Sequence, residues 1–384
     1  RLLKGETPPE VPVTLPNGET IPVSVGYGDG YAYCIKQAGD DPDVTDGIEI
    51  RASVNMHTPT LPHHKENAAP ITGGEAITGG EATTEGETIT GGSAITGGEA
   101  ITGGDAATGG VAVTGGVAVT ITGGVGVGRF TLPGFDSPPG EPAINKAPRQ
   151  MILQNVAAVA NSSLFPSRSS LQVTLSVPQG EAVARKTFNP RLGIEGGISI
   201  IGVSGIVKPF SEEAFIESIR KCMTVAKASG AERVVIHSGA KSEKTLHACY
   251  PHLPSQAFVE YGNAIGETLK IAHELHIPHV TLGIMLGKAV KLAEGNLDTH
   301  SKKVTMNKAF IASLLEEAGC DTDIQAKMGS ITLARELWQL VPSSRLDAFC
   351  RTVIRHCRQH CAPLLPDGDL SILLIDDGGK VYMM

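Results

Sequence analysis

Apolar and polar residues alternate in several short stretches near the start of the chain, which is the pattern of half-buried β-strands. Residues 11–25 alternate on both sides of Asn17–Gly18, a dipeptide that favours a hairpin turn. Residues 31–35 and the segment from 48 onward alternate in the same way, with an acidic loop between them. The sequence therefore predicts a β-hairpin followed by two strands.

A connector punctuated by Pro and Gly then leads into an apolar run at 198–203. We predict a buried strand there, followed by a turn of small residues at Ser204–Gly205. A helix should follow, because Ser211 is a good N-cap and Gly230 ends the helical spacing of apolar residues. Strand, glycine turn and helix in this order can present backbone N–H groups to a nucleotide-like ligand. An ordinary βα unit without a ligand is the alternative, because the dinucleotide-binding spacing lacks its third glycine.

Strand-like and helix-like stretches alternate from here to the C-terminus. We predict a strand at 233–237, a long helix over 255–277, and a strand with a glycine loop and a helix over 278–295. A helix from Thr299, two further helices and two terminal strands complete the pattern. Alternating strands and helices predict a mostly parallel sheet that is covered on both faces.

The predicted fold class is α/β, in two domains. Residues 1–190 form an α+β domain, and residues 191–384 form a Rossmann-like, mostly parallel α/β domain. The first domain carries a repeat with a period of six residues, of the type ITGGEA, over 71–128. Each unit has a pair of glycines whose ordering is entropically costly, so we expect a flexible or weakly β-structured insertion. Deleting about 71–119 should then leave the fold intact, whereas a short β-solenoid is the alternative.

Composition narrows the class of protein. Hydrophobic residues make up 41% of the 384 residues, and the net charge is −8. The repeat holds six acids and no Lys or Arg, which leaves the remainder near −2 and argues against a nucleic-acid partner. No apolar run approaches a membrane span, and the seven cysteines lack CxxC spacing. We expect a cytoplasmic protein with no membrane partner, and the sequence leaves homo-oligomers open.

Several polar motifs are candidate functional groups. GIMLGK at 283–288 is one residue short of a phosphate loop and has Ala289 where a Mg²⁺-binding hydroxyl should stand, which excludes an NTPase. Lys288 could still lie near a cofactor carboxylate. His356 and His360 border a predicted hydrophobic helix face, so we predict no metal site there. His300, at the predicted start of a helix, is the best candidate for a general base in this domain.

Two loops of the first domain are also candidates. The acidic loop with Asp40, Asp41, Asp43 and Asp46 could hold a hard cation or orient a substrate, and a solvated turn is the favoured alternative. The loop that contains Glu141, Asn145 and Arg149 is rigidified by prolines, and a rigid polar loop suits ligand binding.

The longer sequence motifs are more specific than these short patterns. GDDPDVT, GEPAIN with PRQMI, TFNPRLGIEGGISIIGVSGIVKPFSEEAF, GNAIG, and LGKAVKLAEG with DTHSK occur in this order. This order resembles the CbiD family, the cobalt-precorrin-5B C(1)-methyltransferases of anaerobic cobalamin synthesis. The resemblance covers essentially the whole chain outside the repeat. It implies S-adenosylmethionine as methyl donor, a cobalt-containing tetrapyrrole with several carboxylates as acceptor, and cobalt-precorrin-6A as product.

Site residues follow from this hypothesis. Arg149, Lys208 and Lys302 could pair with acceptor carboxylates, and Glu141 and Asn145 share the loop of Arg149. His300 and Asp41 are the candidate catalytic residues, and no metal ligand is proposed. The donor is expected at turns in the second domain, on the residues Gly202, Ser204, Gly205, Gly239, Gly262, Asn263, Gly283, Gly287 and Lys288.

Two features differ from the family pattern. The Thr/Gly-rich segment that usually precedes RLLKGETPP is absent, and Ile284–Met285 stands where many members have a Gly-His pair. The alternative function is therefore a non-catalytic metabolite-binding protein with a nucleotide-like ligand, inactive because that segment is absent. A nicotinamide-dependent oxidoreductase is disfavoured, because no GxGxxG follows a predicted strand.

Overall fold

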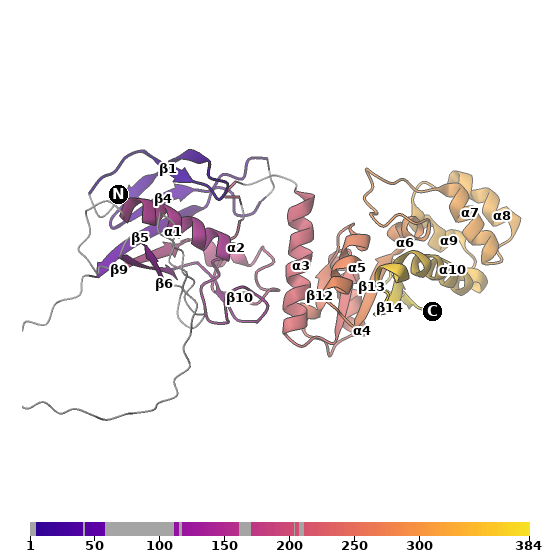
Figure 1. The fold of residues 1–384 in the computed structure, drawn as a ribbon. Helices are drawn as coiled ribbons and strands as arrows, with labels where there is room; N and C mark the ends of the chain where they lie inside the picture. The colour runs from indigo at the N-terminus through magenta and orange to yellow at the C-terminus, as the bar shows by residue number, and fades with distance from the viewer. Residues whose placement is uncertain are drawn as a thin grey trace, which may run out of the picture.

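The chain folds into two lobes (Figure 1). We call the part up to residue 202 the first lobe and the part from residue 211 the second lobe. The structure is a computed structural model, and it describes residues 5–40, 43–57, 111–114, 117–160, 170–202, 204–206 and 211–384.

The first lobe begins with the predicted hairpin. Strands β1 (Glu10–Thr14) and β2 (Thr20–Ser24) pair antiparallel, with Thr14 opposite Thr20. Gly18 has a φ of 85°, a backbone conformation that glycine adopts without strain. The alternation of apolar and polar residues and the Asn17–Gly18 signal thus predicted this element correctly.

A six-stranded sheet with the order β3-β4-β5-β9-β7-β6 forms the body of the first lobe. Its pairs are antiparallel except for the parallel pair of β7 with β9. Alternate residues of β9 are buried, and helix α1 (Lys146–Ala160) packs near β6 and β7. The six strands are β3 (Gly26–Gly28), β4 (Tyr31–Ile35), β5 (Glu49–His57), β6 (Val111–Thr114), β7 (Val117–Gly123) and β9 (Ser170–Ser176).

The end of the hexapeptide repeat belongs to this sheet, which corrects our prediction for the insertion. Val119 and Ile121 of β7 are 0% and 1% exposed and lie in the hydrophobic core of the lobe. Here the Gly pairs give way to VAVTITG, whose valines and isoleucine suit a buried strand. A deletion that reaches residue 119 would therefore remove core residues. Residues 58–110, which hold most of the repeat, lie outside the described part.

The stretch after residue 190 also belongs to the first lobe, contrary to our prediction. Strand β10 (Ile194–Glu195) pairs antiparallel with β8 (Arg129–Phe130). Ile198 and Ile200 form single bridges to Val127 and Ile144 of the first lobe. The expected strand at 198–203 is therefore no part of the second sheet. A short helix, α2 (Gly180–Ala184), lies between β9 and β10.

The second lobe is built on a five-stranded sheet with the order β12-β11-β13-β14-β15. The first four strands are parallel and β15 is antiparallel to β14, so the prediction of a mostly parallel sheet is confirmed. Numbered along the lobe, the order is 2-1-3-4-5, which is the flavodoxin type and not the classic dinucleotide-binding order. The strands are β11 (Arg233–His237), β12 (Phe258–Glu260), β13 (His279–Met285), β14 (Asp369–Ile375) and β15 (Val381–Tyr382).

Helices cover both faces of this sheet. The larger core lies on one face and includes residues of α3 (Glu212–Ala228), α5 (Ile265–Glu274), α6 (Leu286–Ala293) and α10 (Ser343–Cys361). A smaller core on the other face joins Leu246 of α4 (Ala240–Cys249) to β11, β12 and β14. The remaining helices are α7 (Lys308–Glu317), α8 (Thr322–Ala326) and α9 (Leu337–Leu340), with 3-10 turns η2 (Ser255–Ala257), η3 (Lys327–Ser330), η4 (Ala334–Glu336) and η5 (Ala362–Leu364).

Two helix predictions in this lobe are wrong. The predicted long helix over 255–277 is divided into η2, β12 and α5, and Gly262, with a φ of 56°, lies in the turn between β12 and α5. The predicted helix from Thr299 begins only at Lys308, where the Asn307 side chain accepts a hydrogen bond from the backbone N–H of Phe310. None of the helices in the described part combines the length and the apolar character that a membrane crossing requires.

The role of β7 in the core can be tested by mutation. Ile121→Ala should lower the free energy of unfolding by about 2–5 kcal/mol, because it leaves a cavity beside a fully packed strand. Val125→Ala is the matched control, since Val125 is 73% exposed and should change stability by less than about 0.5 kcal/mol. Urea denaturation measures both. Equal effects of the two substitutions would contradict this placement of β7.

Candidate functional site

The carboxyl edge of the second sheet is the natural place for a ligand. Strand β11 lies between β12 and β13. The chain leaves β11 into α4 on one face, and leaves β13 into α6 on the other. In an open parallel sheet the crevice for a ligand forms where the connections part in this way. The turns at this edge are Ser238–Gly239 after β11, Tyr261–Ala264 after β12, and the junction of β13 with α6.

The turn after β11 is open and glycine-dependent. Gly239 has φ 147° and ψ −176°, a region that is essentially restricted to glycine. A Cβ placed on Gly239 would have only the Glu260 carboxylate nearby, at 3.7 Å. Ser242 stabilises the turn by two hydrogen bonds. Its Oγ donates to the Gly239 carbonyl (2.9 Å) and accepts from the Ser238 N–H (3.2 Å). Among the described residues, no other atom lies within 4 Å of that Cβ position.

A buried histidine lies at the end of β11. His237 is 0% exposed, and neither of its ring nitrogens has a hydrogen-bond partner among the described residues. Its Nε2 is 3.9 Å from Oε1 of Glu243, in the first turn of α4. Burial lowers the pKa of His237 to about 4, although the Glu243 carboxylate opposes this shift. The imidazole is therefore neutral near pH 7.

Charged residues from both lobes meet beside this histidine. Arg191 of the first lobe donates from Nη2 to Oε2 of Glu243 at 3.0 Å. Glu260, at the end of β12, has a pKa raised by burial, and the positive charges of Arg191 and Lys288 oppose the shift. The carboxyl edge near β11 and β12 thus faces the first lobe.

Lys288 holds the turn after β12. Its ammonium donates to the Gly262 carbonyl and to Oδ1 of Asn263, the latter at 2.6 Å. Burial lowers the pKa of Lys288. The structure therefore brings three predicted donor-site residues together at one turn, with Lys288 bound to protein oxygens.

The other two predicted glycines of this edge differ from each other. Gly283 is inside β13, and a Cβ there would overlap the Leu246 side chain of α4. Its small size is thus required by helix packing. Gly287 lies in the first turn of α6 and is exposed, and a Cβ placed on it would have no other atom within 4 Å. The predicted glycine loop does not exist, because α6 begins directly after β13.

The remaining predicted donor residues do not reach this edge. Gly202, Ser204 and Gly205 lie in the connector between the lobes. A Cβ on Gly205 would lie 2.9 Å from Leu15 of the first lobe. The hydroxyl of Ser204 donates to the carbonyl of Ile206 within the same turn, at 3.0 Å. The prediction of a strand, turn and helix unit at this place is wrong, because its strand pairs with the first lobe.

His300 and Lys302 lie on a loop that contacts the turn after β12. The N–H of Thr299 donates to the Asn263 carbonyl at 3.1 Å. His300 is partly exposed, and its Nδ1 accepts from the backbone N–H of Lys302 at 3.1 Å. Because Nδ1 accepts this bond, the neutral ring carries its proton on Nε2, which can donate a hydrogen bond to a substrate. Lys302 is exposed.

The acidic loop is mostly closed on itself. Asp43 accepts from Lys36 and from the hydroxyl of Thr45 (2.7 Å), and Asp46 accepts from the backbone N–H of Ala38 (2.8 Å). These bonds favour the interpretation as a structural turn. Asp41 and Lys208 lie outside the described residues.

The Arg149 side chain, predicted to bind an acceptor carboxylate, binds groups of its own lobe. Its Nε donates to the Ile144 carbonyl (2.8 Å), its Nη2 donates to the Pro142 carbonyl (3.2 Å), and Glu141 lies 3.7 Å away. The side chain is 14% exposed, and burial lowers its pKa. Asn145 precedes α1, and its carbonyl accepts the backbone N–H of Arg149. Arg149 therefore fixes the 141–145 loop.

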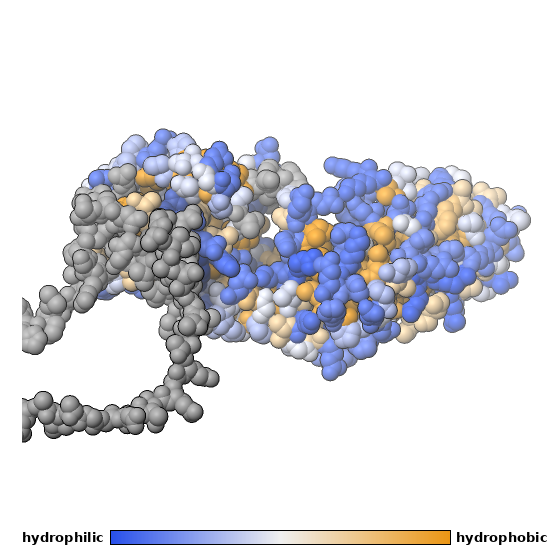
Figure 2. Space-filling model, in the orientation of Figure 1, coloured by the Kyte–Doolittle hydropathy of each residue, from blue (hydrophilic) through white to orange (hydrophobic). Residues whose placement is uncertain are grey.

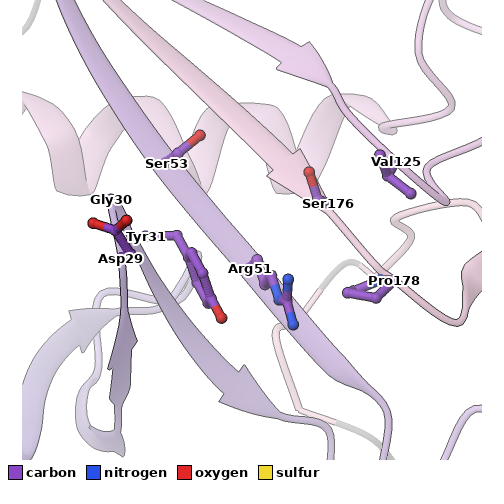
Figure 3. Close-up of a pocket in the computed structure, with 8 residues that line it drawn as sticks. All are labelled: Asp29, Gly30, Tyr31, Arg51, Ser53, Val125, Ser176 and Pro178. Atoms are coloured by element: carbon purple, nitrogen blue, oxygen red, sulfur yellow. The ribbon is translucent and has the colours of Figure 1, made fainter.

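A cavity of about 380 Å³ lies on the polar face of the first sheet (Figure 3). Arg51 stands over the ring of Tyr31 (4.4 Å to its centre) and donates to Glu49 at 2.5 Å. Small-molecule sites measure roughly 300–1,000 Å³, so this cavity is small for a tetrapyrrole. The other residues that line it are Asp29, Gly30, Ser53, Val125, Ser176 and Pro178.

Sequence reasoning missed His237, Glu243 and Glu260. A signal for His237 was present, because the stretch AERVVIHSG predicts a strand that ends at this residue. Glu260 was hidden because the apolar spacing over 255–277 predicts a single helix. The ion pair between Glu243 and Arg191 joins residues 52 positions apart, and no local pattern predicts it.

The structural role of Arg149 gives a test. Arg149→Ala should lower the free energy of unfolding by about 1–3 kcal/mol, because two carbonyls and a carboxylate lose their partner. Arg185→Ala is the control, since Arg185 is 79% exposed and pairs with the exposed Glu181 four positions earlier; its effect should stay below about 0.5 kcal/mol. Thermal denaturation compares them. Unchanged stability of the Arg149 variant would restore this residue as a candidate for substrate binding.

Comparison with known proteins places the chain. The CbiD family matches residues 1–100 and 101–209, and the domain described as CbiD, C-terminal domain, matches residues 298–384. The cobalt-precorrin-5B C(1)-methyltransferase of Prosthecochloris aestuarii is 36% identical over 380 residues, which are 97% of this chain and 88% of that protein. The protein of the same name from Thermus thermophilus is 32% identical over 92% of this chain and 80% of its own length.

A crystal structure of the cobalamin biosynthesis protein (cbiD) from Archaeoglobus fulgidus is 23% identical. It covers 78% of this chain and 75% of its own, with a TM-score of 0.32, which is too low to support a structural inference. The sequence matches do not depend on it, and they extend over both lobes. The chain belongs to the CbiD family.

Proposed function

We propose that this chain transfers a methyl group from S-adenosylmethionine to C-1 of cobalt-precorrin-5B, giving cobalt-precorrin-6A in cobalamin biosynthesis. The observation that carries the proposal is the match over 97% of the chain to a relative named cobalt-precorrin-5B C(1)-methyltransferase. The match includes both lobes. The relative therefore shares the second lobe, which would bind the donor, and the first lobe, which contacts the second.

The carboxyl edge of the second sheet fits the donor. A Cβ on Gly239 would have only the Glu260 carboxylate near it among the described residues, and the buried His237 beside it has no hydrogen-bond partner there. Gly239, Gly262, Asn263, Gly287 and Lys288 lie on turns or helix starts of this edge. We retain these as donor-site residues, with Lys288 acting through the turn that it holds.

The chain's own residues have mostly a positioning role in this reaction. The bound sulfonium supplies an electrophilic methyl group, whose bond to sulfur breaks as the bond to the ring carbon forms. The protein must hold the two reactants in line and exclude water. In the tautomer whose Nδ1 accepts from Lys302, Nε2 of His300 carries the ring proton, so we assign this N–H a hydrogen bond that orients the acceptor. Lys302, exposed beside it, is our candidate for a peripheral carboxylate of the acceptor.

A labelling experiment tests the proposal. The purified chain is incubated with cobalt-precorrin-5B and S-adenosylmethionine that carries a ¹³C methyl group. We expect one labelled methyl group per tetrapyrrole, bonded to a ring carbon by ¹³C NMR, and one equivalent of S-adenosylhomocysteine by mass spectrometry. Binding of S-adenosylhomocysteine without any methylated product would contradict the proposal and favour a non-catalytic binding protein.

A further inference from the structure

The unit from β11 through α4 to β12 has the connectivity of a nucleoside-binding βαβ unit. Strands β11 and β12 are parallel, and His237 lies directly opposite Glu260 in the register. The two strands therefore end at the same level of the carboxyl edge. In dinucleotide-binding units of this kind, an acidic residue about 20 positions after the glycine turn binds the ribose hydroxyls. Glu260 follows Gly239 at that spacing.

Glu260 has the chemistry that this role requires. Its side chain is partly exposed, and it makes no hydrogen bond or ion pair within the part of the chain that the structure describes. An ionised carboxylate is an acceptor of hydrogen bonds on both oxygens, which matches the two neighbouring donors of a ribose. Burial and the neighbouring Glu243 raise the pKa of Glu260, and the positive charges of Arg191 and Lys288 oppose this shift.

The surroundings disfavour a metal ion as the partner of Glu260. Two cationic side chains, Arg191 and Lys288, and one carboxylate, Glu243, act on Glu260, so the cations outnumber the acids beside it. The described residues also contain no group of three or more His, Cys, Asp or Glu side chains that could hold a metal ion. A neutral hydroxyl donor fits better than a cation.

The Ser238–Gly239 turn gives a ligand access to this carboxylate. The nearest atom to a Cβ on Gly239 is Oε1 of Glu260, at 3.7 Å. A group that lies over the turn therefore comes close to the Glu260 carboxylate. Helix α4 starts at this turn, and no side chain caps its N-terminus.

The buried His237 is an independent sign of a polar ligand at this turn. Its ring is fully buried at the end of β11 and approaches Glu243 in the first turn of α4. Both ring nitrogens lack a hydrogen-bond partner among the residues that the structure describes. Buried polar groups without a partner are rare in folded proteins and call for a functional explanation.

We infer that Glu260 binds the ribose hydroxyls of the methyl donor, whose nucleoside lies over the Ser238–Gly239 turn. This inference rests on the proposed function and names the part of the donor that this edge recognises. It also explains why the turn is open on its outer side and why a carboxylate is kept there without a protein partner.

The test is a titration of the full chain with two ligands. Isothermal titration calorimetry measures binding of S-adenosylhomocysteine and of its 2′-deoxy analogue to the wild type, Glu260→Gln and the control Glu267→Gln. Glu267 is an exposed glutamate of α5 that pairs with Lys270. We expect Glu260→Gln to weaken binding of S-adenosylhomocysteine about tenfold, because a charge-assisted hydrogen bond is lost. The control should bind as the wild type does.

The 2′-deoxy analogue separates a ribose contact from a loss of structure. Because it lacks one of the two hydroxyls, the wild type and Glu260→Gln should differ at most about threefold in their affinity for it. Equal weakening of both ligands, or no weakening of either, would overturn the inference while leaving the donor proposal in place. If the wild type itself does not bind S-adenosylhomocysteine, both the inference and the proposed function fail.

Discussion

The second lobe depends on the parallel pairing of β11 with two neighbours at once. Val234, Val235 and Ile236 are completely buried, and hydrogen bonds tie the strand to β12 on one side and β13 on the other. This double pairing brings the ends of three strands to one edge. The connections leave β11 and β13 on opposite faces, which opens the edge to a ligand. The position of every donor-site residue retained here follows from that constraint.

The ion pair between Arg191 and Glu243 links this edge to the first lobe. It joins the turn before β10 to the first turn of α4. On the neighbouring helix α3, Lys221 lies over the ring of Phe135 of the first lobe, at 5.0 Å from the ring centre. The first lobe thus contributes charge beside the donor edge. Figure 2 shows hydrophobic residues between α3 and α6 on a face that is otherwise mainly hydrophilic.

Local patterns predicted the elements whose signals are local. The Asn17–Gly18 hairpin and the strands at 31–35 and 233–237 were predicted from alternation or a buried apolar run, and each is confirmed. The pairing of Ile198 and Ile200 with the first lobe depends on residues far away in the sequence, so no pattern revealed it. Arg149 illustrates the same limit for the site. Its charge suggested a ligand, whereas its partners are backbone carbonyls, which every sequence contains.

The most direct test of the donor site is a crystal structure of the chain with S-adenosylhomocysteine. We predict the nucleoside over the Ser238–Gly239 turn, with the ribose hydroxyls within hydrogen-bond distance of the Glu260 carboxylate and the sulfur on the side of Asn263 and His300. A nucleoside bound instead at the connector near Gly202–Gly205, or in the cavity beside Tyr31 and Arg51 of the first lobe, would contradict this assignment.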